Sequence, residues 1–131
     1  MIKTLFVLSE EYNNPDAIRK LYVQRNDVIV HTLGYEDINT FSVKDKAYLF
    51  DLLDKEQYDI TFILSGKAAK VMLDLPVSKP LETGRIRLVR GKYLAYLESP
   101  GRAKYTRSTK ADSAIGKVAY LLNEISKRKP T

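Results

Sequence analysis

Residues 58–73 of the chain read YDITFILSGKAAKVML, and this stretch decides the fold. The apolar run from Asp59 to Leu64 stops at Ser65-Gly66, and apolar residues at helical spacing follow at once. Such a sequence is typical of a buried strand that turns directly into a helix, as in α/β domains with a parallel sheet. We therefore expect a strand over 59–64 and a helix over 66–73.

The same alternation continues on both sides of this stretch. Apolar runs predict strands at 3–8 and 27–33, and helical spacing predicts helices at 15–25, 43–56 and 111–127. Residues 86–89 and 93–97 flank Arg90-Gly91-Lys92 and form either a hairpin or one bent strand. The order of elements favours a single domain over 1–131, a three-layer α/β/α fold with a mainly parallel four-stranded sheet, and a frayed basic tail at 127–131.

Composition excludes several classes of protein. The 131 residues contain no cysteine and one histidine, so a disulfide framework, a thiolate metal site and a multi-histidine zinc site are all ruled out. No apolar run reaches the about 20 residues of a membrane helix, and the apolar start is too short for a signal peptide. We expect a cytoplasmic protein without a metal or other cofactor and without a membrane partner.

Charge is divided unevenly along the chain. Residues 1–65 hold 7 Lys/Arg against 11 Asp/Glu, whereas residues 66–131 hold 15 against 5. A basic half in a single domain favours DNA or another nucleic acid as partner, because a basic face attracts phosphates. A solvated surface with a basic tail is the alternative, and a tyrosine-rich surface that meets a protein partner is another.

Ligands of parallel sheets bind at the carboxyl ends of the strands. The candidate ligand-binding loops are therefore 9–14, 31–37, 65–68 and 98–108. The first loop carries two carboxylates, and Glu10 or Glu11 is a candidate general base or water-holding group. The base- or ligand-binding candidates are Ser9, Tyr12, Asn13 and His31. The alternatives are a solvated loop and a packed histidine.

Two basic segments are candidates for contact with phosphates. Ser65-Gly66-Lys67 opens a helix and has the ingredients of a phosphate cradle, although the spacing is not that of a Walker A loop. The second segment interleaves cations with tyrosines, which suits a groove that tracks a nucleic-acid backbone. The phosphate-binding candidates of this segment are Arg90, Lys92, Ser99, Gly101, Arg102, Lys104 and Arg107.

The order of these pieces resembles the uracil-DNA glycosylase superfamily. The segments that carry the resemblance are 5–10, 28–31, 62–69, 90–92 and 96–101. The resemblance implies a glycosylase-like fold, Glu10 at the water-activating position, His31 at the base-reading position, and a base flipped into the pocket at the strand ends. Glu98 or Ser99 stands where the family has a catalytic histidine.

The resemblance implies the fold and a DNA-related setting more than it implies uracil excision. The function expected is a nucleic-acid-binding, glycosylase-like domain, either a divergent DNA glycosylase involved in repair or a non-catalytic relative. A small α/β enzyme that acts on a nucleotide or a sugar phosphate is the alternative, with Ser65-Gly66-Lys67 as its anion site.

Overall fold

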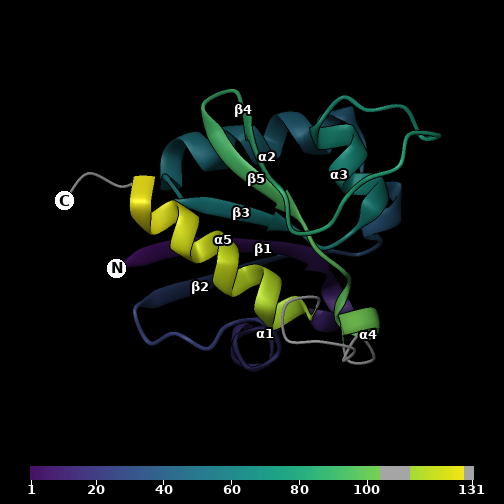
Figure 1. Cartoon of the computed structure of the whole chain (residues 1–131). Helices are drawn as coiled ribbons and strands as arrows, with labels where there is room; N and C mark the ends of the chain where they lie inside the picture. Colours follow the sequence, from purple (N-terminus) through teal and green to yellow (C-terminus); the bar gives the residue numbers. More distant parts are fainter. Residues whose placement is uncertain (104–112, 129–131) are drawn as a thin grey trace.

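The computed structural model describes residues 1–103 and 113–128 (Figure 1). The strands are β1 (Ile2–Ser9), β2 (Val28–Tyr35), β3 (Ile60–Ile63), β4 (Ile86–Val89) and β5 (Lys92–Tyr96). The α-helices are α1 (Pro15–Tyr22), α2 (Val43–Glu56), α3 (Gly66–Met72), α4 (Pro100–Ala103) and α5 (Ala114–Arg128). Two short 3-10 helices, η1 (Glu10–Tyr12) and η2 (Ile38–Thr40), follow β1 and β2.

The strands form one five-stranded mixed sheet in the order β2-β1-β3-β5-β4. β1 pairs in parallel with β2 and β3, and β3 with β5, whereas β4 runs antiparallel to β5. The prediction of a mainly parallel sheet is confirmed, but the prediction of four strands is wrong. The extra strand arises because residues 86–96 form a hairpin, one of the two expected alternatives.

The turn of this hairpin has only two residues, since Val89 pairs with Lys92. Arg90 and Gly91 both have positive φ angles, of 51° and 77°. A two-residue turn with positive φ at both positions matches the right-handed twist of the flanking strands. Glycine at the second position adopts this conformation without steric cost.

One face of the sheet is covered by α1 and α5 (Figure 1). Even-numbered residues of β1 point to this side, among them Phe6 and Leu8, and they meet Ile18 and Tyr22 of α1 and Leu122 of α5. The alternation follows from the period of two along a strand. The rings of Phe6 and Phe62 stack with centroids 4.8 Å apart at the centre of this layer.

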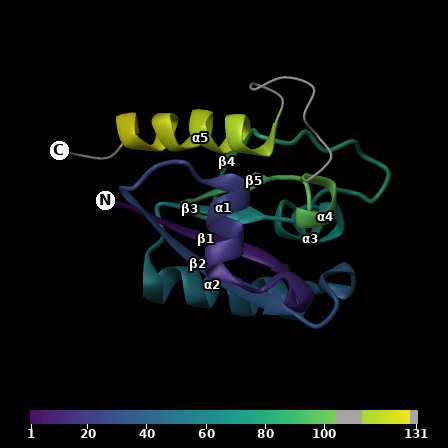
Figure 2. The same ribbon diagram turned by 90° about the horizontal axis from the view of Figure 1, so that it is seen from below.

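The other face is covered by α2 and α3, and Figure 2 shows α5 and α2 on opposite sides of the sheet. Leu5 and Val7 of β1 point to this second layer and pack with Leu49 and Leu53 of α2 and Met72 of α3. Two helical layers with a sheet between them confirm the expected α/β architecture. No helix in the described ranges is long and apolar enough to cross a bilayer.

The ends of three elements, α1, β2 and α5, differ from the expected bounds by two or more residues. α1 ends at Tyr22 rather than at 25, and β2 continues to Tyr35 rather than ending at 33. α5 starts at Ala114 and includes Lys127 and Arg128, so the expected frayed tail does not begin at 127. The Arg128 guanidinium lies over the Tyr93 ring, 5.4 Å from its centroid. This cation–π contact stabilises the last turn of α5.

The hydroxyl of Tyr35 gives a first testable prediction. It is buried without a hydrogen-bond partner among the described residues, and burial raises the pKa of Tyr35 to about 12, with Asp45 and Tyr48 adding to the effect. Because an unsatisfied buried hydroxyl costs free energy, Tyr35→Phe should leave the free energy of unfolding unchanged or raise it by up to about 1 kcal/mol. Urea denaturation measures this.

Tyr120→Phe is the matched control, because Tyr120 is 60% exposed on α5, away from the Tyr35 hydroxyl. We expect this control to change the free energy of unfolding by less than about 0.5 kcal/mol. A loss of more than about 1 kcal/mol in Tyr35→Phe would show that its hydroxyl has a partner.

Candidate functional site

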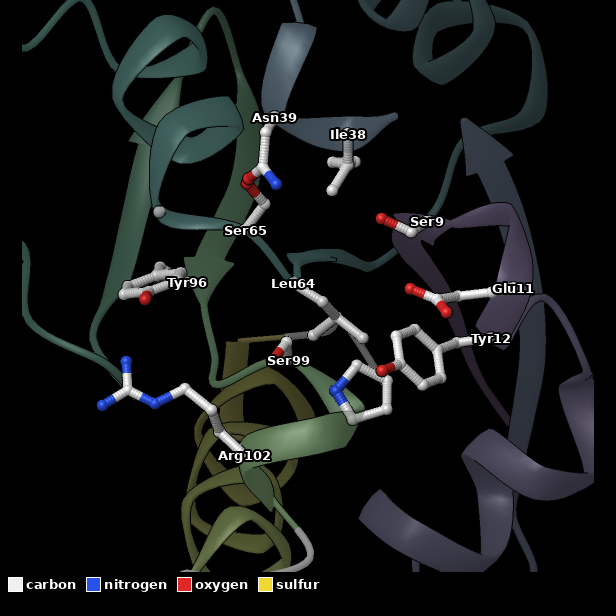
Figure 3. A pocket seen from close by; sticks show the side chains of 12 residues that line it. Ser9, Glu11, Tyr12, Ile38, Asn39, Leu64, Ser65, Tyr96, Ser99 and Arg102 are labelled. Atoms are coloured by element: carbon white, nitrogen blue, oxygen red, sulfur yellow. The ribbon is translucent and has the colours of Figure 1, made fainter. Parts of the chain in front are cut away.

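A pocket of about 290 Å³ lies at the carboxyl ends of β1, β3 and β5 (Figure 3). The chain leaves β1 for β2 on one side and returns to β3 on the other, so the topological switch point of the sheet lies between β1 and β3. Parallel α/β sheets bind their ligands at such points. We call this cavity the strand-end pocket; it is lined by Ser9, Glu11, Tyr12, Ile38, Asn39, Leu64, Ser65, Gly66, Tyr96, Ser99, Pro100 and Arg102.

One side of the strand-end pocket comes from the segments that follow β1 and β2. Ser9 ends β1, and the single turn η1 then carries Glu11 and Tyr12 to the pocket, as Figure 3 shows. Asn39 lies in η2, whose start is fixed by the Asp37 carboxylate, which accepts the Asn39 backbone N–H at 3.0 Å. Short 3-10 turns therefore set the positions of a carboxylate, a ring and an amide.

The other side comes from the ends of β3 and β5. Ser65 caps α3, and its hydroxyl accepts the backbone N–H of Ala68 at 3.3 Å. Tyr96 ends β5, and a Cβ on Gly66 would lie 3.4 Å from the Tyr96 hydroxyl oxygen. A Cβ there would make an ordinary van der Waals contact, so the start of α3 lies next to the Tyr96 ring. Ser99 and Arg102 complete this side at the start of α4.

Opposite charges stand on opposite sides of the strand-end pocket (Figure 3). Glu11 lies beside Tyr12, whereas the Arg102 guanidinium lies on the side of Tyr96. A guanidinium presents several N–H donors that suit a phosphate or a carboxylate. Asn39 can both donate and accept hydrogen bonds. The pocket can therefore bind an anionic group at Arg102 and form hydrogen bonds from Asn39 to the polar edge of a ring.

A partly buried ion pair holds Glu98, which lies between β5 and Ser99. The Lys117 ammonium of α5 donates to the Glu98 carboxylate and, at 2.7 Å, to the Thr83 hydroxyl. The Tyr22 hydroxyl of α1 donates to the Glu98 carbonyl at 2.6 Å. Burial raises the pKa of Tyr22, and the Glu98 carboxylate and Tyr12 nearby raise it further. Glu98 therefore connects α1 and α5 to the segment that carries Ser99 into the pocket wall.

Three of the predicted catalytic and base-binding residues, Glu10, Asn13 and His31, do not line the strand-end pocket. The Glu10 carboxylate accepts the Asn13 side-chain N–H at 3.3 Å, and Asn13 in turn accepts the Thr32 hydroxyl at 2.6 Å. These two residues tie η1 to β2, while the neighbouring Glu11 lines the pocket. The reason is local, because the 3-10 turn sends adjacent side chains in different directions.

His31 lies in the middle of β2, where it pairs with Leu5. Its Nδ1 is 2.8 Å from the Tyr58 hydroxyl, and it does not line the pocket. The resemblance implies that His31 occupies the base-reading position, but β2 continues through Tyr35, and the segment after it supplies Asn39. Asn39 is thus the residue that the β2 side brings to the pocket.

The predicted phosphate-binding residues are divided by the fold. Ser65, Gly66, Ser99 and Arg102 line the strand-end pocket, and a Cβ on Gly101 would lie 3.2 Å from the Tyr12 hydroxyl oxygen. Lys67 is exposed and does not line it. Arg90 lies over the Phe50 ring at 4.7 Å, and Lys92 pairs with Asp54 at 3.1 Å, so both contact α2. Lys104 and Arg107 lie outside the described residues.

Sequence reasoning missed Ile38, Asn39, Leu64, Tyr96 and Pro100 as pocket residues. The rule that ligands bind at strand ends could have found Tyr96, which ends β5. Asn39 was missed because the ligand-binding loop after β2 was predicted to end at residue 37.

Within the described residues, no group of three or more His, Asp or Glu side chains is arranged to hold a metal ion. Comparison with protein-family models gave no match, and no curated protein is significantly similar to the chain. The residues of the strand-end pocket are therefore the best indication of what the protein binds.

Proposed function

We propose that the protein binds nucleic acid and holds one nucleotide in the strand-end pocket. The observation that carries this proposal is the chemistry of the lining: the rings of Tyr12 and Tyr96, the amide of Asn39 and the guanidinium of Arg102. Aromatic rings stack on bases, an amide pairs with a base edge, and a guanidinium binds phosphate.

The volume and the charge of the chain support the same ligand. The pocket holds about 290 Å³, near the lower end of the range for small-molecule sites, so it suits one nucleotide unit rather than a large ligand. The Arg102 side chain is exposed, so a phosphate bound to it can remain partly in solvent. The basic second half of the chain adds a long-range attraction to a polyanion.

The resemblance to the uracil-DNA glycosylase superfamily supports a base-binding role in a glycosylase-like fold. Three of the segments that carry the resemblance, 5–10, 62–69 and 96–101, contribute Ser9, Ser65 and Ser99 to the pocket. If the protein excises a base, Glu11 is the carboxylate that positions water, because Glu10 is turned toward Asn13. A non-catalytic relative would use the same pocket for binding alone.

Binding to DNA tests the proposal at Arg102. We expect Arg102→Ala to weaken binding of a fluorescent oligonucleotide and to reduce the slope of log affinity against log salt by about 1, because one phosphate contact is lost. Fluorescence anisotropy at about 50 mM and about 200 mM salt measures both quantities.

Lys44→Ala is the control for this prediction, since Lys44 is an exposed cation on α2 that does not line the pocket. It should leave the salt slope within experimental error of that of the unsubstituted protein. Equal slopes for Arg102→Ala and the unsubstituted protein would remove Arg102 from the interface. Absence of any binding at low salt would overturn the nucleic-acid proposal as a whole.

A uracil-containing duplex separates the two forms of the proposal. Strand cleavage after alkali reports an abasic site and would establish excision. In that case Glu11→Gln should lower the excision rate about 100-fold, and Glu10→Gln should leave it near that of the unsubstituted protein. Binding without abasic sites would leave a nucleic-acid-binding domain.

A free nucleotide or a sugar phosphate is the second candidate ligand. The observation that favours it is the set of three hydroxyls from Ser9, Ser65 and Ser99 around the pocket, which suits a ligand rich in hydroxyl groups. A nucleoside monophosphate that binds tightly while oligonucleotides do not compete with it would favour this candidate.

A further inference from the structure

A second cavity, of about 470 Å³, lies beside the strand-end pocket. It runs along α1, where its lining includes Ala17, Lys20 and Leu21, and we call it the α1 groove. It shares Glu11, Tyr12 and Pro100 with the strand-end pocket. The two cavities therefore lie on either side of one wall.

Contacts between η1 and α4 hold this wall in place. Tyr12 is partly buried and packs against the core layer under α1 and α5, and Pro100 at the start of α4 is buried. The Tyr12 hydroxyl reaches α4, because a Cβ on Gly101 would lie only 3.2 Å from its oxygen. The wall is thus built from a ring and a proline whose positions depend on two different elements.

The α1 groove differs in chemistry from the strand-end pocket. Ala17, Ile18 and Leu21 present an apolar surface, and Lys20 is an exposed cation on the same helix. A nucleobase has two apolar faces and is joined to a phosphate, so an apolar groove with a lysine at its edge is complementary to it. Together the two cavities supply two cations, Arg102 and Lys20, and one carboxylate, Glu11, which lines both of them.

We infer that the α1 groove holds the nucleotide next to the one in the strand-end pocket, so that the ligand is single-stranded nucleic acid. This inference rests on the proposed function. Two neighbouring bases separated by the Tyr12–Pro100 wall are unstacked from each other. A duplex opposes this arrangement, because both bases would lose their pairs and their stacking.

Calorimetric titration with short ligands tests the inference. Each of the four deoxynucleoside 5′-monophosphates is compared with its 5′-phosphorylated homodinucleotide. We expect the dinucleotide of the preferred base to bind at least about tenfold more tightly, because a second base adds its own contact energy. A single-stranded oligonucleotide should likewise bind at least about tenfold more tightly than its duplex.

Ala17→Glu should weaken nucleotide binding in the α1 groove without altering the strand-end pocket. It places a carboxylate beside the bound phosphodiester, and an acidic residue in the first turn of α1 is compatible with the helix. We expect it to abolish the tenfold gain of the dinucleotide and to leave monophosphate binding unchanged. Ala47→Glu adds the same charge at an exposed position of α2 and should retain the gain.

The outcomes separate the inference from the proposed function. Monophosphates that bind through Arg102, with no gain for any dinucleotide, would overturn the role of the groove and leave the proposed function standing. A gain that survives Ala17→Glu, or duplex binding as tight as single-strand binding, would also overturn it. Failure of every nucleotide and oligonucleotide to bind would overturn both.

Discussion

Lys117→Met should lower the free energy of unfolding by about 3 kcal/mol, because it leaves the Glu98 carboxylate buried without its cation. The side chain of Glu98 is only 10% exposed, and its second oxygen, Oε2, has no hydrogen-bond partner among the described residues. Lys117 is therefore the main compensation for this charge. Urea denaturation with an unchanged slope against denaturant would show that stability alone is altered.

The same helix offers a matched control. Lys127 pairs with Glu124 at 3.5 Å, but the Lys127 side chain is 74% exposed, so Lys127→Met should cost less than about 0.5 kcal/mol. Adding Glu98→Gln to Lys117→Met should recover part of the lost stability, because no buried charge then remains. Similar costs for the two lysine variants would contradict the burial argument.

Phe6→Ala should lower the free energy of unfolding by about 3–5 kcal/mol, the usual cost of removing a buried ring. Phe6 is fully buried at the centre of the layer under α1 and α5. Its ring centroid is 5.5 Å from that of Tyr22 and 4.8 Å from that of Phe62. The loss combines the transfer of the ring to water with the cavity that remains between two strands and a helix.

Tyr48→Ala controls for the loss of an aromatic side chain as such. Tyr48 is 65% exposed on α2, and its replacement should change the free energy of unfolding by less than about 0.5 kcal/mol. Phe6→Leu should fall between the two, since a leucine fills part of the cavity. A cost for Phe6→Ala no larger than that for Tyr48→Ala would mean that the layer repacks around the cavity.

The strand-end pocket could be anticipated only in part. The rule for parallel sheets directed attention to the ends of β1, β3 and β5, and Ser9, Tyr12, Ser65, Ser99 and Arg102 do line the pocket. The choice between Glu10 and Glu11 could not be made, because it depends on how a single 3-10 turn orients adjacent side chains. The position of Asn39 depends on the length of β2, which extends to Tyr35 and not to residue 33 as predicted.

The basic residues show the same division between local and tertiary information. A run of cations in the sequence indicates a basic surface, but Arg90 and Lys92 contact Phe50 and Asp54 of α2 instead of the pocket. Their positions follow from the hairpin turn and from the packing of α2 on the same face. A charge pattern alone does not distinguish a cation that packs on a helix from one that faces a ligand.

By itself, the sequence determined the alternation of strands and helices, because periods of two and of about 3.6 residues act over short stretches of chain. It also determined local ends, such as the cap of α1, where the Asn14 side chain accepts the Asp16 and Ala17 backbone N–H groups. It did not determine that residues 86–96 form two paired strands. Only the tertiary structure decided which residues meet. Tyr12, Asn39, Tyr96 and Arg102 come from separate segments, and the strand order brings them together. That order reflects burial summed over the whole sheet, which no single stretch of sequence carries.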